Sequence, residues 1–405
     1  MARLNALLAG FTALIFSSTA AVADPDPTNW QAVEKAAKGQ TLYFNAWGGE
    51  PRINAYIAWA GEQVKARYGV TVEHVKLTNT ADAVARVTTE KAAGKTDGGS
   101  VDMIWINGEN FANMKRSGLL FKAWGDKLPN YALIDPNEKP AVAYDFTVPV
   151  EGDEAPWDMA QLVYIYDSAH LPSPPKSMAA LLAWAEKEPG RFTYPLVPNF
   201  LGTTFLKQAL YEVIADRSAL SRPVDSAKFA NQTAPLWAYL DKLHPNLWRK
   251  GRHFPANSTE QRALINDGEI AMALSFNPLE ATAGILADEL PKSTRTAVFD
   301  GGTIANANFV AIPFNSGVKE GAMVFANFLM SPEAQARKQD PEYWGGLTVL
   351  DVADLPPAEK ARFDALDLGE ASLTPDKLGP TLAEPHPSWA AALEKEWLRR
   401  YGSGG

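Results

Sequence analysis

Residues 41–77 read TLYFNAWGGEPRINAYIAWAGEQVKARYGVTVEHVKL and predict a strand, a helix and a second strand in that order. The first seven residues are apolar and aromatic and end at Gly48-Gly49, which is typical of a buried strand that stops in a tight turn. Pro51 suits the first turn of a helix, and Gly69 suits its C-terminal cap. The stretch therefore predicts a β-α-β unit of a parallel sheet.

The same pattern continues and then restarts further along the chain. Residues 81–93 are expected to form a helix, and residues 101–106 a buried strand that ends at Asn107. This alternation favours a doubly wound sheet, whose ligands collect outside the carboxyl ends of its strands. A strand at 160–166 and a helix at 177–187 indicate the start of a second lobe.

The length supports two lobes, because about 380 residues after a leader exceed what one hydrophobic core usually organises. We expect an α/β fold in which each lobe is a doubly wound sheet flanked by helices. Lobe 1 is expected to span residues 24–155 with a return segment at 303–345. Lobe 2 is expected to span 156–302 with a C-terminal helical segment at 346–405. In that last segment Trp389, Leu393 and Trp397 recur at helical spacing and predict a core-facing stripe.

The N-terminus has the pattern of a secretory signal peptide. Arg3 precedes the apolar run LLAGFTALIF, and small residues lead to Ala23, after which we expect cleavage. A buried N-terminal helix is the alternative. The chain has no cysteine, which excludes a lipid-modified cysteine, a disulfide and a thiolate metal site. These features predict a protein of the periplasm, released by cleavage of residues 1–23.

Charge and motifs exclude several other classes of function. The formal net charge of -9 argues against nucleic acid as a partner. The sequence has no G-x-S-x-G elbow, no H-E-x-x-H and no P-loop, and its five histidines are scattered. We therefore expect neither an enzyme nor a metal or cofactor site. A secreted hydrolase remains the alternative from another class.

A series of short motifs occurs in a fixed order along the chain. They include AWGG at 46–49, DMIWINGEN at 102–110, SGLL at 117–120, LVY at 162–164, PPKS at 174–177, DGEIAM at 267–272 and SPEAQ at 331–335. In this order the chain resembles the type II ABC transporter substrate-binding proteins. The resemblance is to extracellular solute-binding family 1 and its YnjB-like branch, and it covers nearly the whole chain after the leader.

The resemblance implies a monomeric Venus-flytrap that closes on a small molecule. Such a protein hands its solute to an inner-membrane ABC permease that works with a cytoplasmic ATPase. The solute has to contact both lobes, because only preferential binding to the closed state shifts the equilibrium toward it. The YnjB-like resemblance implies thiamine or a related heteroaromatic cation. A carbohydrate or an anionic metabolite stays open as an alternative ligand.

Candidate ligand residues in lobe 1 lie where its strands end. They are Trp47, Gly48, Gly49, Asn107 and Glu109. A tryptophan can stack on a ring, and glycines let a ligand approach the backbone closely. The alternatives are a core tryptophan, ordinary turn glycines and a solvated carboxylate in the first turn of a helix.

Candidates in the rest of the chain lie at the expected lobe junction and at helix starts. Trp157 and Asp158 combine an aromatic ring with a carboxylate and suit a cationic ring, unless they form a hinge turn fixed by an Asx hydrogen bond. Helix N-termini attract polar acceptors, although side chains there often only cap their own helices. An asparagine beside the return crossing either binds ligand or forms a turn. These further candidates are Thr203, Thr204, Asn277 and Asn306.

Overall fold

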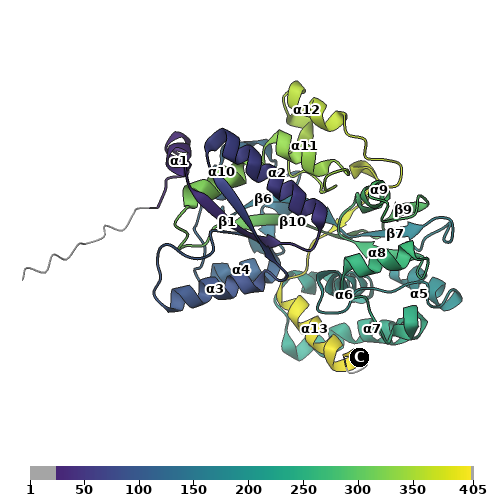
Figure 1. Ribbon diagram of the computed structural model, residues 1–405. Helices are drawn as coiled ribbons and strands as arrows, with labels where there is room; N and C mark the ends of the chain where they lie inside the picture. Colours follow the sequence, from purple (N-terminus) through teal and green to yellow (C-terminus); the bar gives the residue numbers. More distant parts are fainter. Residues whose placement is uncertain (1–23, 403–405) are drawn as a thin grey trace, which may run out of the picture.

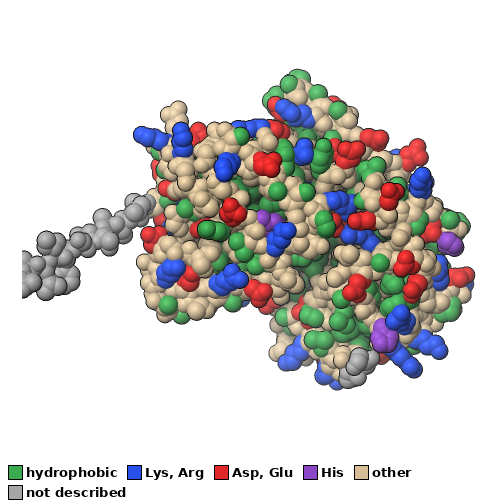
Figure 2. All heavy atoms as spheres, in the orientation of Figure 1, with side chains coloured by type: hydrophobic (Ala, Val, Ile, Leu, Met, Phe, Trp, Pro, Cys, Tyr) green, Lys and Arg blue, Asp and Glu red, His purple; other side chains and the backbone are tan. Residues whose placement is uncertain are grey.

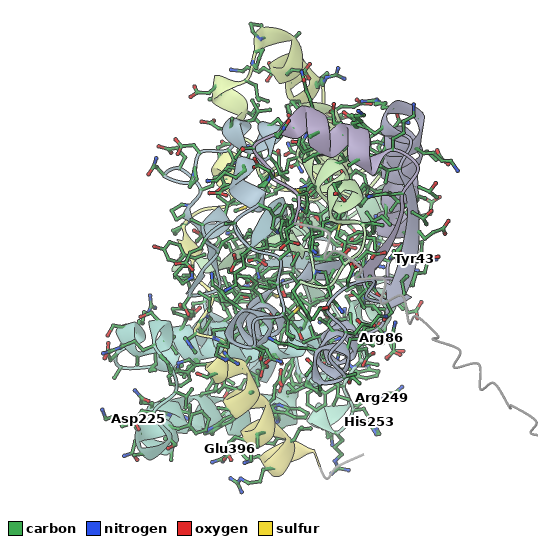
Figure 3. All side chains as sticks on the ribbon, turned by 90° about the vertical axis from the view of Figure 1, so that its left-hand side faces the viewer. Tyr43, Arg86, Asp225, Arg249, His253 and Glu396 are labelled. Carbon is green, nitrogen blue, oxygen red and sulfur yellow. The ribbon has the colours of Figure 1, made fainter. Side chains whose placement is uncertain are left out.

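The computed structural model describes residues 24–402 and shows two lobes (Figure 1). The expected signal peptide, residues 1–23, lies outside the described residues. Tyr43 and Arg86 lie in lobe 1, and Asp225 and Glu396 lie in lobe 2 (Figure 3). No helix within residues 24–402 is long and apolar enough to cross a membrane.

The sheet of lobe 1 has the strand order β2-β1-β3-β10-β6. Strands β2 and β3 run parallel to β1 on its two sides, and β10 runs antiparallel to both β3 and β6. The bounds are Thr41–Trp47 for β1, Thr71–Leu77 for β2, Met103–Ile106 for β3, Glu154–Gln161 for β6 and Thr303–Ala311 for β10. The predicted parallel β-α-β-α-β unit is therefore present, and β1 has the bounds expected from the sequence.

Seven helices and a small hairpin complete lobe 1 among the described residues. Helix α2 begins at Pro51 and is capped at its C-terminus by Gly69, whose φ of 72° is left-handed. Both features were predicted from the sequence. The helices are α1 (Trp30–Ala37), α2 (Pro51–Tyr68), α3 (Ala81–Ala92), α4 (Gly108–Arg116), α10 (Lys319–Leu329), α11 (Pro332–Gln339) and α12 (Pro357–Asp364), and the hairpin strands are β4 (Tyr144–Asp145) and β5 (Val148–Pro149).

Strands β6 and β10 connect the two lobes. They pair antiparallel from Glu154 opposite Ala311 to Gln161 opposite Ala305, with a register shift between Asn308 and Phe309. At one end of β10, Phe309 lies in the core of lobe 1, and at the other end Ile304 lies in the core of lobe 2. The crossing is thus a two-stranded ribbon without a separate linker.

Lobe 2 contains a smaller sheet with the order β8-β7-β9. Strand β7 is antiparallel to both neighbours, which differs from a parallel doubly wound sheet. Strands β8 and β9 share one direction and are joined through α9, and β7 enters between them directly from the crossing strand β6. The elements are β7 (Val163–Asp167), β8 (Met272–Ser275), β9 (Thr294–Ala297), β11 (Thr381–Leu382), α5 (Met178–Lys187), α6 (Phe200–Val213), α7 (Ser226–Leu243), α8 (Ser258–Asn266), α9 (Glu280–Leu286) and α13 (Ser388–Tyr401).

Each lobe has its own hydrophobic core. Val349 and Phe363 belong to the core of lobe 1, beyond the expected end of its return segment at residue 345. The chain then passes to lobe 2, where Trp389, Leu393 and Trp397 are all buried. The predicted core-facing stripe of α13 is confirmed.

Candidate ligand site between the lobes

The ends of the lobe 1 strands meet the crossing ribbon at Asn308 of β10. Its Oδ1 accepts hydrogen bonds from Trp105 Nε1 at 3.2 Å and from Asn107 Nδ2 at 3.0 Å. Its Nδ2 donates to Asp158 Oδ2 at 2.9 Å. Asn308 therefore joins two of the predicted site residues, Asn107 and Asp158, into one polar cluster.

Trp47 places a half-buried ring beside this cluster. It lies at the carboxyl end of β1, with its ring centroid 6.5 Å from that of Trp105 and nearly perpendicular to it. A Cβ on Gly49 would fall 2.4 Å from the Trp47 ring, so only glycine lets the chain pass against it. Both polar backbone groups of Gly48 are hydrogen-bonded. Its N–H donates to the Leu77 carbonyl at the end of β2, and its carbonyl accepts from Asn54 Nδ2 on α2. The two glycines thus shape the turn that holds the Trp47 ring.

The structure corrects the assignment of Trp157 as a ligand-contacting residue. Its side chain is fully buried in the core of lobe 1, at an irregularity in the pairing of β6 with β10. The ring packs edge-on against Trp105 at 4.9 Å and against Trp344 at 5.1 Å between centroids. Trp157 therefore supports Trp105 from behind and does not line the site.

Asp158 is neutralised by a residue that the sequence did not suggest. Lys338 Nζ lies 3.1 Å from Asp158 Oδ1, and both side chains are buried. Lys338 also donates to the carbonyls of Trp157 and Leu347. Burial raises the pKa of Asp158, and burial lowers the pKa of Lys338 to about 8. Asp158 thus has an internal cation and also accepts the hydrogen bond from Asn308.

Helix α6 of lobe 2 begins earlier than expected. Asn199 caps it by accepting a hydrogen bond from the Leu201 backbone N–H at 3.0 Å, so Thr203 and Thr204 lie inside the helix and do not cap it. Thr203 Oγ1 donates to Glu394 Oε1 at 2.7 Å. The Thr204 hydroxyl is buried and has no hydrogen-bond partner among residues 24–402.

Asn277 contacts lobe 1 directly. Its Nδ2 donates to the Trp344 carbonyl at 3.0 Å, and its Oδ1 accepts from the Leu279 backbone N–H at 3.0 Å. Helix α9 begins only at Glu280, so the predicted cap is an Asx turn just before the helix. The Asn277 side chain is thus committed to the contact between the lobes.

Three carboxylates lie where α4 approaches α6 and α13. Lys207 Nζ donates to Glu384 Oε2 at 2.6 Å, and Asn306 Nδ2 donates to Glu384 Oε1 at 3.1 Å. Burial raises the pKa of Glu394, and the negative charge of Glu109 on α4 adds to this effect. The Glu109 side chain itself is exposed in the first turn of α4. In the space-filling view the outline of the molecule is indented between α4 and α13 (Figure 2).

A second group of charged residues joins the lobes elsewhere. Arg262 of α8 contacts Glu50, which follows β1, and Glu280 of α9. Arg52 of α2 contacts the same two carboxylates, Glu50 at 3.4 Å and Glu280 at 3.5 Å. These four side chains form a network with members from both lobes.

The structure brings five of the predicted residues into one region. Trp47, Asn107, Thr203, Asn306 and Glu109 lie where the lobes and the crossing ribbon meet. Four other polar residues of this region come from distant segments and carry no local sequence signal: Lys207, Lys338, Glu384 and Glu394.

The chain is similar to bacterial solute-binding proteins over most of its length. The family model described as bacterial extracellular solute-binding protein matches residues 59–363. Protein YnjB of Escherichia coli K12 is 45% identical over 376 residues, which cover 93% of this chain and 95% of the relative.

Solved structures show the same two-lobe fold. The spermidine/putrescine substrate-binding protein PotD of Streptococcus pneumoniae matches with a TM-score of 0.61 and 17% identity. The periplasmic binding protein AfuA of Actinobacillus pleuropneumoniae, solved with fructose-6-phosphate, matches with a TM-score of 0.61 and 14% identity. Each covers 90% of this chain and 99% of the matched structure.

Proposed function

Because this chain belongs to the bacterial extracellular solute-binding protein family and is the substrate-binding component of an ABC transporter, we propose that it captures a heteroaromatic cation. Thiamine is the first candidate. The protein acts as a monomer in the periplasm after cleavage behind Ala23. It delivers the intact solute to an inner-membrane permease that is driven by a cytoplasmic ATPase, and it has no catalytic step.

One pair of features supports a cationic aromatic solute. The half-buried Trp47 ring at the end of β1 is placed to stack on a planar ring. The carboxylates Glu109 and Glu394 lie near each other between α4 and α13, and neither makes a salt bridge within residues 24–402, whereas Glu384 is paired with Lys207. Unpaired carboxylates favour a cation and disfavour an anionic metabolite.

The contacts expected for the solute come from both lobes and the crossing ribbon. Trp47 and Asn107 come from lobe 1, Thr203 comes from lobe 2, and Asn306 and Asn308 come from the crossing strand β10. A solute that touches all three parts binds the closed state better than the open one, which is the requirement for closure. A carbohydrate would stack on Trp47 equally well, but its neutral hydroxyl groups would bind the carboxylates less strongly than a cation would.

Thermal unfolding of refolded protein against a panel of solutes tests the proposal. The panel contains thiamine, its phosphates, sugars, polyamines and dicarboxylates. At about 100 times its dissociation constant, the true solute adds roughly 2.7 kcal/mol of stability and raises Tm by a few degrees. We expect this shift with thiamine and its loss in Trp47→Ala. A shift only with sugars or dicarboxylates would overturn the proposal, and release of cleaved thiamine would favour a hydrolase.

A further inference from the structure

The ammonium group of Lys207 lies in a cage of aromatic and polar side chains. Its Nζ is 5.1 Å from the ring centroid of Phe146 and 5.5 Å from that of Phe200. Glu384 accepts its hydrogen bond at 2.6 Å, and Asn306 holds the other oxygen of Glu384. We call these five residues the Lys207 cage.

The cage is assembled from parts that are far apart in the sequence. Phe146 lies in the turn between β4 and β5 of lobe 1, and Phe200 and Lys207 lie on α6 of lobe 2. Asn306 lies on the crossing strand β10, and Glu384 follows β11. Because its two rings belong to different lobes, the cage is complete only when the lobes are in contact.

The backbone that presents Phe146 is strained. Its φ of 54° is left-handed, which costs energy for a bulky residue and is typical of ligand clamps. The preceding carboxyl group of Asp145 accepts hydrogen bonds from the Gly108 backbone N–H at 2.7 and 2.9 Å. A Cβ on Gly108 would fall 2.8 Å from the Phe146 ring, so glycine is required beneath it. The local sequence thus holds this ring in the cage despite the strain.

The hydrogen bonding inside the cage is incomplete. Lys207 is 3% exposed and donates to only one acceptor within the described part of the chain. Asn306 is 4% exposed, and its Oδ1 accepts no hydrogen bond from any described residue. A buried acceptor without a donor is costly, and a ligand N–H group would satisfy it.

Two aromatic faces and a carboxylate around a nitrogen cation are the recognition geometry of ammonium groups. We propose that the Lys207 cage is a cation subsite of the ligand site, which takes an ammonium or ring-nitrogen cation of the solute. The Lys207 ammonium group competes with the solute cation for the cage and thereby determines which cations bind. This inference rests on the proposed function in that it concerns the same site between the lobes.

The position of the cage relative to the Trp47 ring fits one solute that reaches both. Asn306 and Asn308 are two residues apart on β10, so their side chains share one face of the strand. Asn306 belongs to the cage, and Asn308 belongs to the polar cluster with Trp105 and Asn107. The solute's aromatic ring would lie at Trp47 and its second cationic or N–H group in the cage.

Chemical rescue tests the subsite without knowledge of the natural solute. The variant Lys207→Ala removes the internal cation, and n-propylammonium chloride is then added to replace it. We expect a lowered Tm in the variant and a saturable rise of Tm with millimolar propylammonium that the wild type does not show. Uncharged n-propanol and the double variant Lys207→Ala/Glu384→Gln are the controls and should show no rescue. Equal effects of propanol and propylammonium, or no rescue, would overturn the subsite.

A second variant tests the competition. Lys207→Gln has a side chain one atom shorter than lysine and lacks the positive charge, but it keeps a polar N–H group for Glu384, which favours retention of the fold. In titration calorimetry its dissociation constant for thiamine should be lower than that of the wild type by about threefold or more. An unchanged or higher dissociation constant would overturn the role of Lys207 as competitor. If the wild type binds no thiamine at all, the proposed function fails, and the propylammonium result still decides the subsite.

Discussion

Arg262 Nη2 in lobe 2 lies 2.9 Å from Glu50 Oε2 in lobe 1. Arg262 Nη1 also lies 2.8 Å from Glu280, and each of the three side chains is about one-tenth exposed or less. Burial lowers the pKa of Arg262, but the charges of Glu280, Glu50 and Glu289 and the hydrogen bond to Glu50 raise it, with a net upward shift. The contact therefore stabilises the arrangement in which the lobes touch.

Replacement of Arg262 by glutamine is expected to weaken the contact between the lobes. Removal of one partner from a largely buried network leaves Glu50 and Glu280 without their main cation, which costs up to about 3–5 kcal/mol. Small-angle X-ray scattering should show a larger radius of gyration for Arg262→Gln than for the wild type under the same conditions. The control is Arg67→Gln, which breaks the more exposed pair with Glu333 within lobe 1. Equal radii for all three proteins would contradict this role.

Replacement of Trp157 by alanine is expected to act on stability. The ring is fully buried among Phe44, Tyr56, Trp105 and Trp344, so its loss opens a cavity in the core of lobe 1. Such truncations cost about 3–5 kcal/mol. Chemical denaturation should show this loss for Trp157→Ala. A fully stable variant with weakened solute binding would instead restore the assignment of Trp157 to the ligand site.

The pair Asp158–Lys338 is expected to be strongly coupled. Loss of Lys338 alone leaves a buried carboxylate without its cation, and such losses cost about 3–5 kcal/mol. In the double variant Asp158→Asn/Lys338→Met no buried charge is left unpaired. The double variant should therefore be more stable than the sum of the single losses predicts, by more than about 1 kcal/mol in equilibrium denaturation. Additive losses would show that the two charges do not act as a pair.

Asp145 is expected to make stability depend on pH. Burial raises the pKa of this carboxyl group to about 8 in the folded protein, against about 3.9 in an unfolded chain. Between these values the folded state binds more protons than the unfolded state, so this group lowers stability as pH rises from about 4 to about 8.

The variant Asp145→Asn removes this effect. Relative to the wild type it should become more stable as pH rises through this window, by up to about 1 kcal/mol per pH unit. Urea denaturation of both proteins at several pH values measures the difference. A difference in stability that stays constant with pH would contradict a buried, protonated Asp145.

Local sequence patterns predicted the elements of the fold because period and capping act over a few residues. The strand at 41–47, the helix from Pro51 to Gly69 and the buried stripe of α13 follow from such patterns. The antiparallel entry of β7 has no such signal, since strand direction depends on where the crossing ribbon delivers the chain.

The site was predictable only in part. Trp47 and Asn107 lie at strand ends, which the β-α-β pattern locates. Trp157 was misassigned because almost every residue of β6 is buried, so alternation gives no sign of which side faces a ligand. Lys207 and Glu384 are 177 residues apart, and nothing near either residue indicates that they pair.

Closure of the two lobes on a heteroaromatic cation can be followed by energy transfer between dyes on the two lobes. The chain has no cysteine, so dyes can be attached at Arg86→Cys on α3 and Lys228→Cys on α7, two exposed positions on different lobes. Thiamine should change the transfer efficiency in a saturable manner, and Trp47→Ala should raise the concentration needed by about tenfold or more. No change in transfer efficiency with thiamine, or with any cation that stabilises the protein against heat, would contradict closure of the lobes on such a cation.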